Sequence, residues 1–287
     1  MATGDDYRID RRAVRRNNRR HASEAAGFDA IAREVAARME ERLDYIRLSP
    51  RRILDLGCGA GTDRERLQAR YREADVLGVD SCAAVLGAGR RRGLLGRLLG
   101  GRAPATAADA LALPFRPASF GMVWSNLMMQ WLDDPAPAFA EIHRVLEVDG
   151  MVMFSSLGPD SLKELRRAFP ETSVHRFIDM HDVGDALVRA GFGDPVMDMQ
   201  MLTVTYASAD KLLADLRGGG HANARADRPR GLLGTRAWQS RLTRLDQGRR
   251  DGVLPITLEL VFGHAWKLPP RTDEHGRSVV RFHPPRP

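Results

Sequence analysis

Cysteine is nearly absent from this chain of 287 residues, which contains only Cys58 and Cys82. Two cysteines cannot build a disulfide framework, and their spacing fits no zinc site, so no metal is expected. No apolar run approaches the roughly 20 residues that a membrane helix needs. The N-terminus lacks the apolar segment of a secretion signal. We therefore expect a cytoplasmic protein without membrane contact.

Lysine and aromatic residues are scarce as well. Lys163, Lys211 and Lys267 are the only lysines, so arginine carries almost all of the positive charge behind the formal net charge of +7. Clustered cations favour nucleic acid as a partner. Aromatic residues make up only 6 % and do not interleave with the arginine runs, so no base-stacking platform is predicted. We expect no nucleic-acid partner, and an acidic protein partner is equally compatible with the charge.

Hydrophobic residues make up 43 % of the chain, enough for a large buried core. Short apolar runs alternate with helical stretches, which is typical of a parallel sheet with crossover helices. Strands are expected at 52–56, 76–80, 105–108, 120–125, 150–156, 198–206 and 256–263. Helices are expected near 28–47, 62–71, 82–99, 135–146, 160–168, 181–190, 208–217 and 236–249. The pattern predicts an α/β fold, a doubly wound, Rossmann-like, seven-stranded, mostly parallel sheet with helices on both faces.

The predicted core carries additions at both ends. Residues 1–22 are polar and Arg-rich, and two interpretations stay open: a solvated, partly ordered arm or a basic docking surface. A Gly- and Arg-rich segment at 218–234 is a candidate lid. The expected divisions are an N-terminal arm and helix covering the cleft (1–48), a cofactor-binding core (49–207), a helical lid insertion (208–250), the last core strand (251–267) and a disordered tail (268–287).

A glycine-rich turn follows the first predicted strand. Gly57, Gly59 and Gly61 come directly after it, at the carboxyl end where doubly wound sheets bind ligands. Glycine lets the backbone turn sharply and approach a ligand closely. A dinucleotide fold would need its third glycine at position 62, where this chain has Thr62. The spacing favours an adenosyl sulfonium, which brings no pyrophosphate. Cys58 is interpreted as a small filler of this loop.

Two acidic residues follow the next strands. Asp80, with Ser81, ends the second strand about twenty residues beyond the glycines, where a carboxylate accepts from both ribose hydroxyls. The alternative is an acid that caps a helix. Asp109, with Ala110, follows the third strand and is placed to accept from an adenine amino group. Its alternative is a surface turn.

The glycine turn, these two acids and the run 122–126 resemble class I S-adenosylmethionine-dependent methyltransferases over about residues 50–160. The resemblance implies S-adenosylmethionine as the cofactor, with the loop Gly57–Gly61 around its methionine part. It further implies that Asp55 helps to hold the cofactor's amino group and that backbone near Ser125 does likewise.

Several further segments are similar to a narrower family, the malonyl-[acyl-carrier protein] O-methyltransferases of biotin synthesis, from about residue 20 to 267. The segments are 124–131, 144–146, 150–156, 160–165, 176–177 and 216–220. This resemblance implies methyl transfer to the free carboxylate of malonyl-acyl-carrier protein. A carboxylate is already a nucleophile near neutral pH, so no Ser-His or Cys-His pair is needed. One departure lies at 23–29, where Phe28 is the only aromatic residue and relatives commonly carry a Tyr.

A bidentate arginine is the natural clamp for the substrate carboxylate. Arg176 and Arg217 are the candidates, and an exposed surface arginine is the alternative for each. Gln130 and Trp131 follow the fourth strand and are expected to line the methyl-transfer channel, with core packing as the alternative for Trp131. Three histidines are interpreted as surface or hydrogen-bonded residues without catalytic roles: His175, His181 and His221.

Acyl-carrier proteins are strongly acidic, so clustered arginines at 90–97 and 225–236 are expected docking patches. Two other functions stay open. One is a methyltransferase or related modifying enzyme with another small-molecule or protein substrate, because 120–165 and 210–225 also resemble the mitochondrial complex I assembly factor. The other is a non-catalytic protein that binds the cofactor and serves as an assembly factor, scaffold or nucleic-acid adaptor. The sequence does not determine the oligomeric state.

Overall fold

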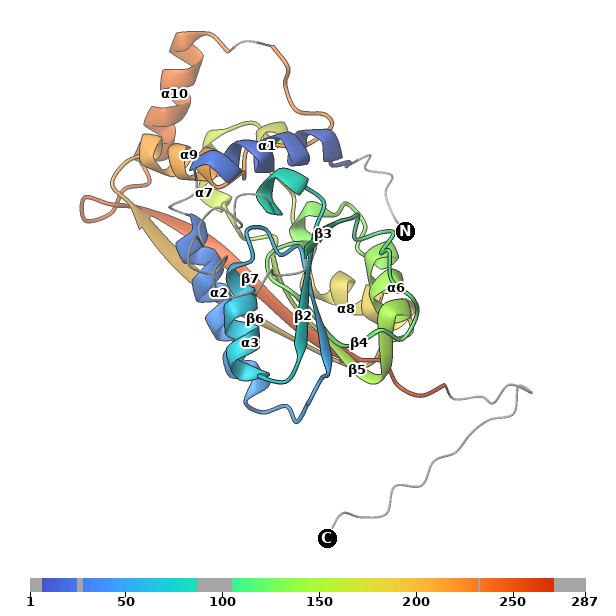
Figure 1. Ribbon diagram of the computed structural model, residues 1–287. Coiled ribbons are helices and arrows are strands. Elements are labelled where there is room, and N and C mark those ends of the chain that lie inside the picture. The colour runs from blue at the N-terminus through green and yellow to red at the C-terminus, as the bar shows by residue number, and fades with distance from the viewer. Residues whose placement is uncertain (1–6, 25–27, 87–104, 232, 271–287) are drawn as a thin grey trace, which may run out of the picture.

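The computed structural model describes residues 7–24, 28–86, 105–231 and 233–270 (Figure 1). The predicted arginine patch at 90–97 and most of the predicted tail lie outside these ranges, and of the predicted helix at 82–99 only 83–86 is described as helical. Every helix within the described ranges is too short or too polar to span a bilayer. In the same part of the chain, no three His, Cys, Asp or Glu side chains gather closely enough to hold a metal ion.

Seven strands form one sheet in the order β3-β2-β1-β4-β5-β7-β6. The strands are β1 (Arg52–Leu56), β2 (Asp75–Asp80), β3 (Ala105–Ala107), β4 (Phe120–Ser125), β5 (Leu146–Leu157), β6 (Gly193–Tyr206) and β7 (Leu254–Trp266). Strands β1 to β5 run parallel to one another, whereas β7 is antiparallel to both β5 and β6. This arrangement confirms the predicted doubly wound, mostly parallel α/β sheet.

Strands β6 and β7 are longer than the sequence predicted. They pair with each other from Gly193↔Trp266 to Tyr206↔Leu254. Exposed residues such as Met199 and Met201 alternate with partly buried ones along β6, because β6 is an edge strand with one face open to solvent. The predicted ranges therefore captured only part of each strand.

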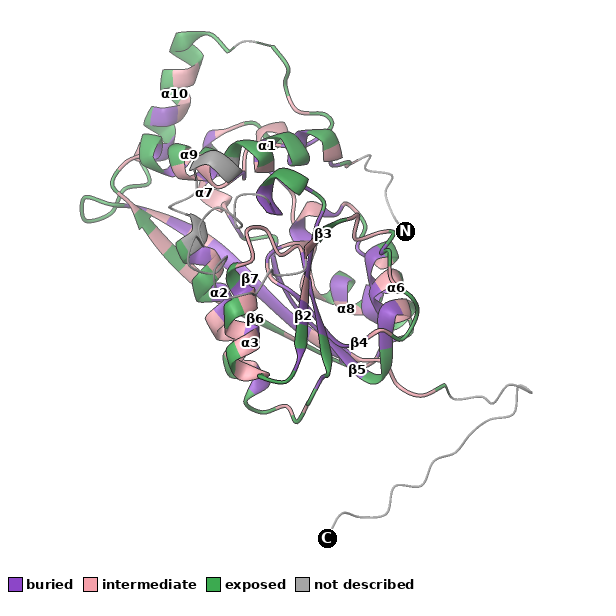
Figure 2. Ribbon diagram, viewed as in Figure 1, coloured by how far each residue is buried: buried purple, intermediate pink, exposed green. Residues whose placement is uncertain are grey.

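Helices cover both faces of the sheet, and the core is divided accordingly (Figures 1 and 2). Alternate residues of each central strand point to opposite faces. Met122 and Trp124 of β4 pack with α2 (Phe28–Leu43) and α3 (Thr62–Arg70), whereas Val123 packs with α6 (Ala136–Val145) and α8 (Met180–Arg189). Burial on both faces explains why the central strands read as continuous apolar runs.

Four further helices lie over the carboxyl ends of the parallel strands (Figure 1). They are α1 (Arg11–Glu24), α7 (Lys163–Ala168), α9 (Ala209–Gly218) and α10 (Thr235–Asp246). Helix α9 contacts both α1 and α10. The segment between β6 and β7 therefore supplies two helices to the same end of the sheet as the N-terminal helix.

The N-terminal segment is bound to a distant loop. The amide of Asp10 donates to the carbonyl of Ala224 at 2.7 Å, and Asn17 Nδ2 donates to the carbonyl of Ala222 at 2.8 Å. Arg228 and Asp10 form an ion pair at 2.8 Å. Ile9, Ala13, Val14 and Ala224 form a small apolar core of their own, with Tyr7 and Trp131 packed against it. We call residues 7–24 and 222–228 together the cover.

The cover corrects two interpretations of the sequence. A solvated, partly ordered arm is wrong for residues 7–20, because 11–24 is helical and Ala13, Val14 and Asn17 are buried. The prediction of a basic surface patch at 225–236 is also wrong for Arg225. Arg225 is only 3 % exposed and donates two hydrogen bonds to Asp227. Its charge is therefore used inside the fold.

Asp10 is predicted to hold the cover closed, because its carboxylate accepts from the amide of Ala13 at 3.0 Å as well as from Arg228. Asp10→Ala removes a helix cap of about 1 kcal/mol, so amide hydrogen exchange should accelerate in α1 while the sheet stays protected. Asp134→Ala, which removes a similar bond to Ala136 at the start of α6, is the matched control and should leave α1 unchanged.

The same contact should depend on pH. The bond from Arg228 holds the pKa of Asp10 below its ordinary value. The stabilisation is therefore present at neutral pH and is lost as the pH falls through the folded-state pKa. Equal exchange in α1 of the wild-type and Asp10→Ala chains at neutral pH would contradict this role.

Candidate functional site

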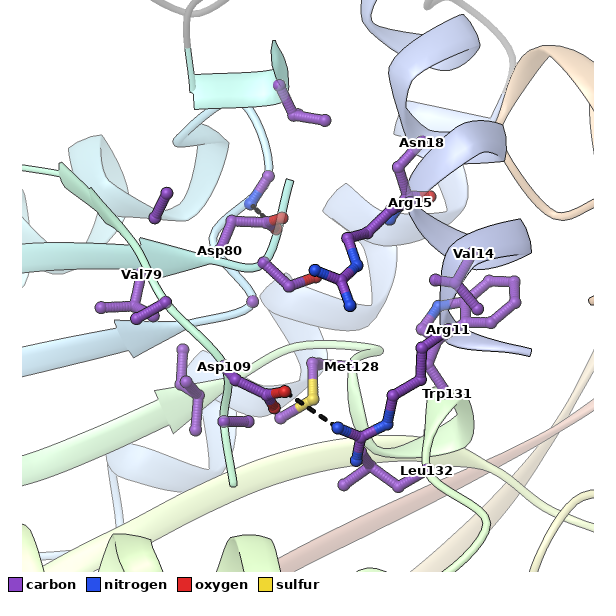
Figure 3. A pocket seen from close by; sticks show the side chains of 18 of the residues that line it. Arg11, Val14, Arg15, Asn18, Val79, Asp80, Asp109, Met128, Trp131 and Leu132 are labelled. Carbon is purple, nitrogen blue, oxygen red and sulfur yellow. Dashed lines mark hydrogen bonds and ion pairs between the residues drawn. The ribbon is translucent and has the colours of Figure 1, made fainter. Parts of the chain in front are cut away.

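A cleft of about 350 Å³ lies at the carboxyl ends of β1, β2, β3 and β4, beneath α1. Six of the nine residues expected to bind the cofactor line it: Gly57, Gly59, Asp80, Ser81, Asp109 and Ala110. Trp131, which was expected to line the methyl-transfer channel, lines it as well. The other three, Asp55, Gly61 and Ser125, are not among the residues that line the cleft. Helix α1 supplies the facing wall through Arg11, Val14, Arg15 and Asn18 (Figure 3).

The glycine turn has the backbone geometry that its sequence requires. Gly57, Gly59 and Gly61 have φ values of 80°, 53° and 85°, a region that favours glycine. A Cβ atom at Gly57 would lie 2.6 Å from the Cβ of Met128, so a side chain there would displace the loop after β4. The turn therefore keeps the floor of the cleft open.

Asp80 supports this turn from the neighbouring strand. One carboxylate oxygen accepts from the amide of Gly59 at 3.0 Å, and the other accepts from the amide of Cys82 at 2.7 Å. Burial raises the pKa of Asp80, and these two amides oppose the increase. Each oxygen retains a second lone pair, so the carboxylate can still accept from a ligand.

Two further carboxylates lie close to the turn. Asp55 is fully buried, and its Oδ2 has no hydrogen-bond partner among the residues that the structure describes. Burial, and then the charges of Asp63 and Asp80, raise the pKa of Asp55 well above its ordinary value. A buried carboxylate oxygen without a partner is costly in an empty site. The arrangement fits a ligand that brings a positive charge, such as an ammonium group.

Asp63 was not predicted from the sequence as a site residue, and it links the turn to β4. Its Oδ2 accepts from Trp124 Nε1 at 2.9 Å and from Asn126 Nδ2 at 3.0 Å. Asn126 Oδ1 accepts from Ser155 Oγ, which in turn accepts from the amide of Leu127. This chain of hydrogen bonds fixes the loop after β4 against the start of α3. The only sequence signal for it is an acid directly after Thr62.

Ser125 and Cys58 occupy structural positions in the described site. Ser125 is buried and donates from Oγ to the carbonyl of Leu56 at 3.0 Å, which joins the ends of β4 and β1. Cys58 Sγ lies 2.8 Å from where a Cβ of Gly78 would be, so it fills the space between two strands. Burial, and then the charge of Asp55, raise the pKa of Cys58, so the thiol is not ionised at neutral pH.

Two arginines of α1 reach into the cleft (Figure 3). Arg11 forms an ion pair with Asp109 at 2.8 Å. Arg15 extends toward Asp80, and its guanidinium has no hydrogen-bond or ion-pair partner in the described ranges. The sequence placed both among many arginines of a polar segment, so no local signal separated them from the others. Only the docking of α1 brings them to the site.

The residues expected to orient the substrate lie apart from this cleft. Arg176 pairs with Glu171, and the Arg217 guanidinium lies 5.7 Å from the ring centroid of Trp238. Gln130 is 5 % exposed, and neither atom of its amide has a partner among the described residues. An amide buried without partners costs free energy, which is consistent with a position kept for a ligand.

An aromatic cluster closes the cleft on the side of Trp131. The Trp131 ring lies against His175 at 5.2 Å and His221 at 5.5 Å between centroids. The amide of Ala224 donates to His175 Nε2 at 3.1 Å, so Nδ1 carries the proton and donates to Tyr7 at 3.2 Å. Burial lowers the pKa of His175 to about 4. His175 is therefore a neutral, hydrogen-bonded residue, and Tyr7 is a contact that the sequence did not predict.

Solved structures share the fold. A Haemonchus contortus phosphoethanolamine N-methyltransferase in complex with S-adenosylhomocysteine is 18 % identical, with a TM-score of 0.54 over 82 % of this chain and 52 % of that one. The [4+2]-cyclase SpnF is 16 % identical, with a TM-score of 0.52 over 82 % of each chain. Because the second protein is named a cyclase, the shared fold alone does not define a reaction.

Sequence relatives are far closer. Residues 54–154 match the model of a methyltransferase domain, whose cofactor is S-adenosylmethionine. A malonyl-[acyl-carrier protein] O-methyltransferase of Laribacter hongkongensis is 49 % identical over 92 % of this chain and 93 % of its own. One of Gallionella capsiferriformans is 44 % identical over 96 % of this chain and 98 % of its own. The chain therefore belongs to the malonyl-[acyl-carrier protein] O-methyltransferase family.

Proposed function

We propose that this enzyme transfers the methyl group of S-adenosylmethionine to the free carboxylate of a malonyl thioester on acyl-carrier protein, at the start of biotin synthesis. The observation that carries the proposal is the similarity to relatives of that name over more than nine-tenths of both chains. It includes the cover and the segment between β6 and β7, where a substrate is read. The free thiols of Cys58 and Cys82 fit a reducing cytoplasm.

The chemistry asks little of the protein beyond positioning. S-adenosylmethionine supplies a methyl group on a positively charged sulfur, and the malonyl carboxylate is already ionised near neutral pH. No general base is needed, which agrees with a neutral His175 and a protonated Cys58. Catalysis then depends on alignment of the reacting atoms and on exclusion of water by the cover.

The cofactor roles expected from the sequence fit the residues of the cleft. Asp80 is proposed to bind the ribose hydroxyls, and the turn at Gly57–Gly61 to surround the methionine part. Asp55 is proposed to hold the amino group, because its unpartnered oxygen fits a positive charge. Asp109, with Ala110, is proposed for the adenine edge. Since Arg11 now pairs with Asp109, that ion pair must open or be shared when adenine binds.

Arg15 is proposed as the residue that binds the malonyl carboxylate. Arg11 and Arg15 are the cations among the described residues that line the cleft, and Arg11 is already paired. Arg15 has no such partner, and its planar guanidinium matches a carboxylate. Arg176 and Arg217, which the sequence offered as clamps for this carboxylate, do not line the cleft, and Gln130 stays a prediction for the methyl-transfer channel.

The direct test is transfer of labelled methyl from S-adenosylmethionine to malonyl-acyl-carrier protein, with Asp80→Asn beside the wild type. We expect a base-labile methyl ester from the wild type. Loss of one charged hydrogen bond, about 2 kcal/mol, should weaken cofactor binding roughly thirtyfold in the variant. Cofactor binding without transfer to the malonyl thioester would sink the proposed reaction.

Replacing Asp55 should stabilise the cofactor-free protein and weaken its binding of the cofactor. Asp55→Asn removes a buried charge, so the cofactor-free variant should melt about 3 °C higher, as 1 kcal/mol does in a domain of this size, and bind the cofactor more weakly. Because the folded-state pKa of Asp55 is raised, its ionisation costs stability at neutral pH, and this cost disappears at acid pH. Calorimetry at both pH values should therefore find that the difference in melting temperature between the variant and the wild type disappears on acidification. A lower melting temperature at neutral pH would contradict the assignment.

Arg15→Met is expected to raise the KM for malonyl-acyl-carrier protein about tenfold, since one ion pair is lost, with little change in cofactor affinity. Arg15→Lys should restore part of the loss. Arg47→Met, an exposed position before β1, is the control. If cofactor affinity falls instead and the KM for the malonyl substrate is unchanged, Arg15 holds the cofactor and not the substrate.

A further inference from the structure

The outer face of α1 is a stripe of arginines. Arg12, Arg16 and Arg19 are exposed and are spaced by four and three residues, so they share one side of the helix. The opposite side, with Ala13, Val14 and Asn17, is buried in the cover. Within the described ranges, none of the three guanidinium groups has a hydrogen-bond or ion-pair partner. No acid occurs in α1 before its last residue, Glu24.

Helix α10 repeats this pattern at the same end of the molecule. Arg236 and Arg244 are exposed and Arg241 is half-buried, and all three lack an ion-pair partner in the part of the chain that the structure describes. Helices α1 and α10 both contact α9, so the two helices that carry these arginines lie on one end of the molecule (Figure 1). We call these six residues the arginine face.

Four arginines on α2 and α3, beside the sheet, have acidic partners. Arg38 and Arg42 of α2 pair with Glu34 and Asp198, and two arginines of α3 pair with acids of α2 and the loop after it. Like charges without counterions repel each other, so their concentration on α1 and α10 is not explained by stability of the fold. An acidic partner would supply the missing counterions.

The position of the arginine face relative to the cleft identifies the partner. Helix α1 lines the cleft with Arg11 and Arg15 and carries the stripe on the adjacent side, since each stripe residue Arg12 and Arg16 directly follows one of them. A protein bound to the stripe is therefore held within one helix diameter, about 10 Å, of the cleft. A substrate attached to that protein by a flexible arm reaches the site beside this helix.

We propose that the arginine face is the docking surface for the acidic acyl-carrier protein that delivers the thioester. The inference rests on the proposed function and adds to it the place of contact. Acidic residues of the carrier meet Arg12, Arg16 and Arg19 on α1 and the three arginines of α10. The contact steers the carrier to the mouth of the cleft, while recognition of the malonyl group itself stays with the residues inside.

The test compares two triple charge reversals with a matched control. The first variant carries Arg12→Glu, Arg16→Glu and Arg19→Glu, and the second carries Arg236→Glu, Arg241→Glu and Arg244→Glu. The control reverses three exposed arginines in the loops before β1 and β2, at the opposite end of the sheet: Arg47→Glu, Arg51→Glu and Arg72→Glu. Each variant changes the net charge by the same amount. Cofactor affinity is measured in all of them to show that the cleft is intact.

Kinetics are measured with malonyl-acyl-carrier protein and with malonyl-pantetheine, which lacks the carrier. At low salt, at least one of the first two variants should lose about tenfold or more in kcat/KM for the carrier substrate relative to the control. The loss should shrink as salt screens the charges. Turnover of malonyl-pantetheine should be unchanged.

The outcomes separate this inference from the proposed function. A wild type that methylates neither thioester sinks the proposed function. A wild type that methylates the carrier substrate, with both variants equal to the control, overturns the docking surface alone. Equal losses on both thioesters also overturn it, because the arginines would then act on the cleft. If the triple variants lose binding of RNA while their kinetics with the carrier substrate are unchanged, the arginine face binds a nucleic acid and the inference is overturned.

Discussion

The turn between β1 and α3 is the constraint on which the site depends. The backbone passes through positive φ at three alternate residues, and Met128 leaves no room for a side chain at the first of them. Asp80 holds the middle of the turn through the amide of Gly59. Asp63, just beyond the turn, binds Trp124 and Asn126. The carboxyl ends of the adjacent strands β2, β1 and β4 are thereby joined at one point, and the cleft lies above it.

Negative charge is concentrated around the same turn. Asp55, Asp63 and Asp80 are all buried, and the pKa of each is raised chiefly by loss of solvent. Such a cluster is unfavourable by itself, so the fold retains it at the expense of stability. In the proposed cofactor roles, an ammonium group and a sulfonium would relieve part of that repulsion. Affinity for the ligand and instability of the empty site therefore have the same physical origin.

Local patterns in the sequence predicted most of the sheet and the glycine turn. Apolar runs marked the central strands, because strands that are buried on both faces are mostly apolar. Glycine at alternate positions marked the turn, since only that residue adopts its φ values cheaply. The cover was not predictable in this way. Arg15 and Tyr7 lie in a polar segment whose burial depends on Ala222 and Ala224, which are distant in the chain. Periodicity within one segment carries no information about such a partner.

The cover joins parts of the chain that are made at very different times. Asn17 and Ala222 are separated by 205 positions, and Asp10 and Arg228 by 218. During synthesis, α1 leaves the ribosome long before the loop that buries its apolar side. Contacts of such separation are slow to form. Strands β1 to β5 are made before that loop, whereas β6 joins the sheet only through β7, which is made after it. The nascent protein therefore passes through a stage in which the five parallel strands can pair and the cleft still has no roof.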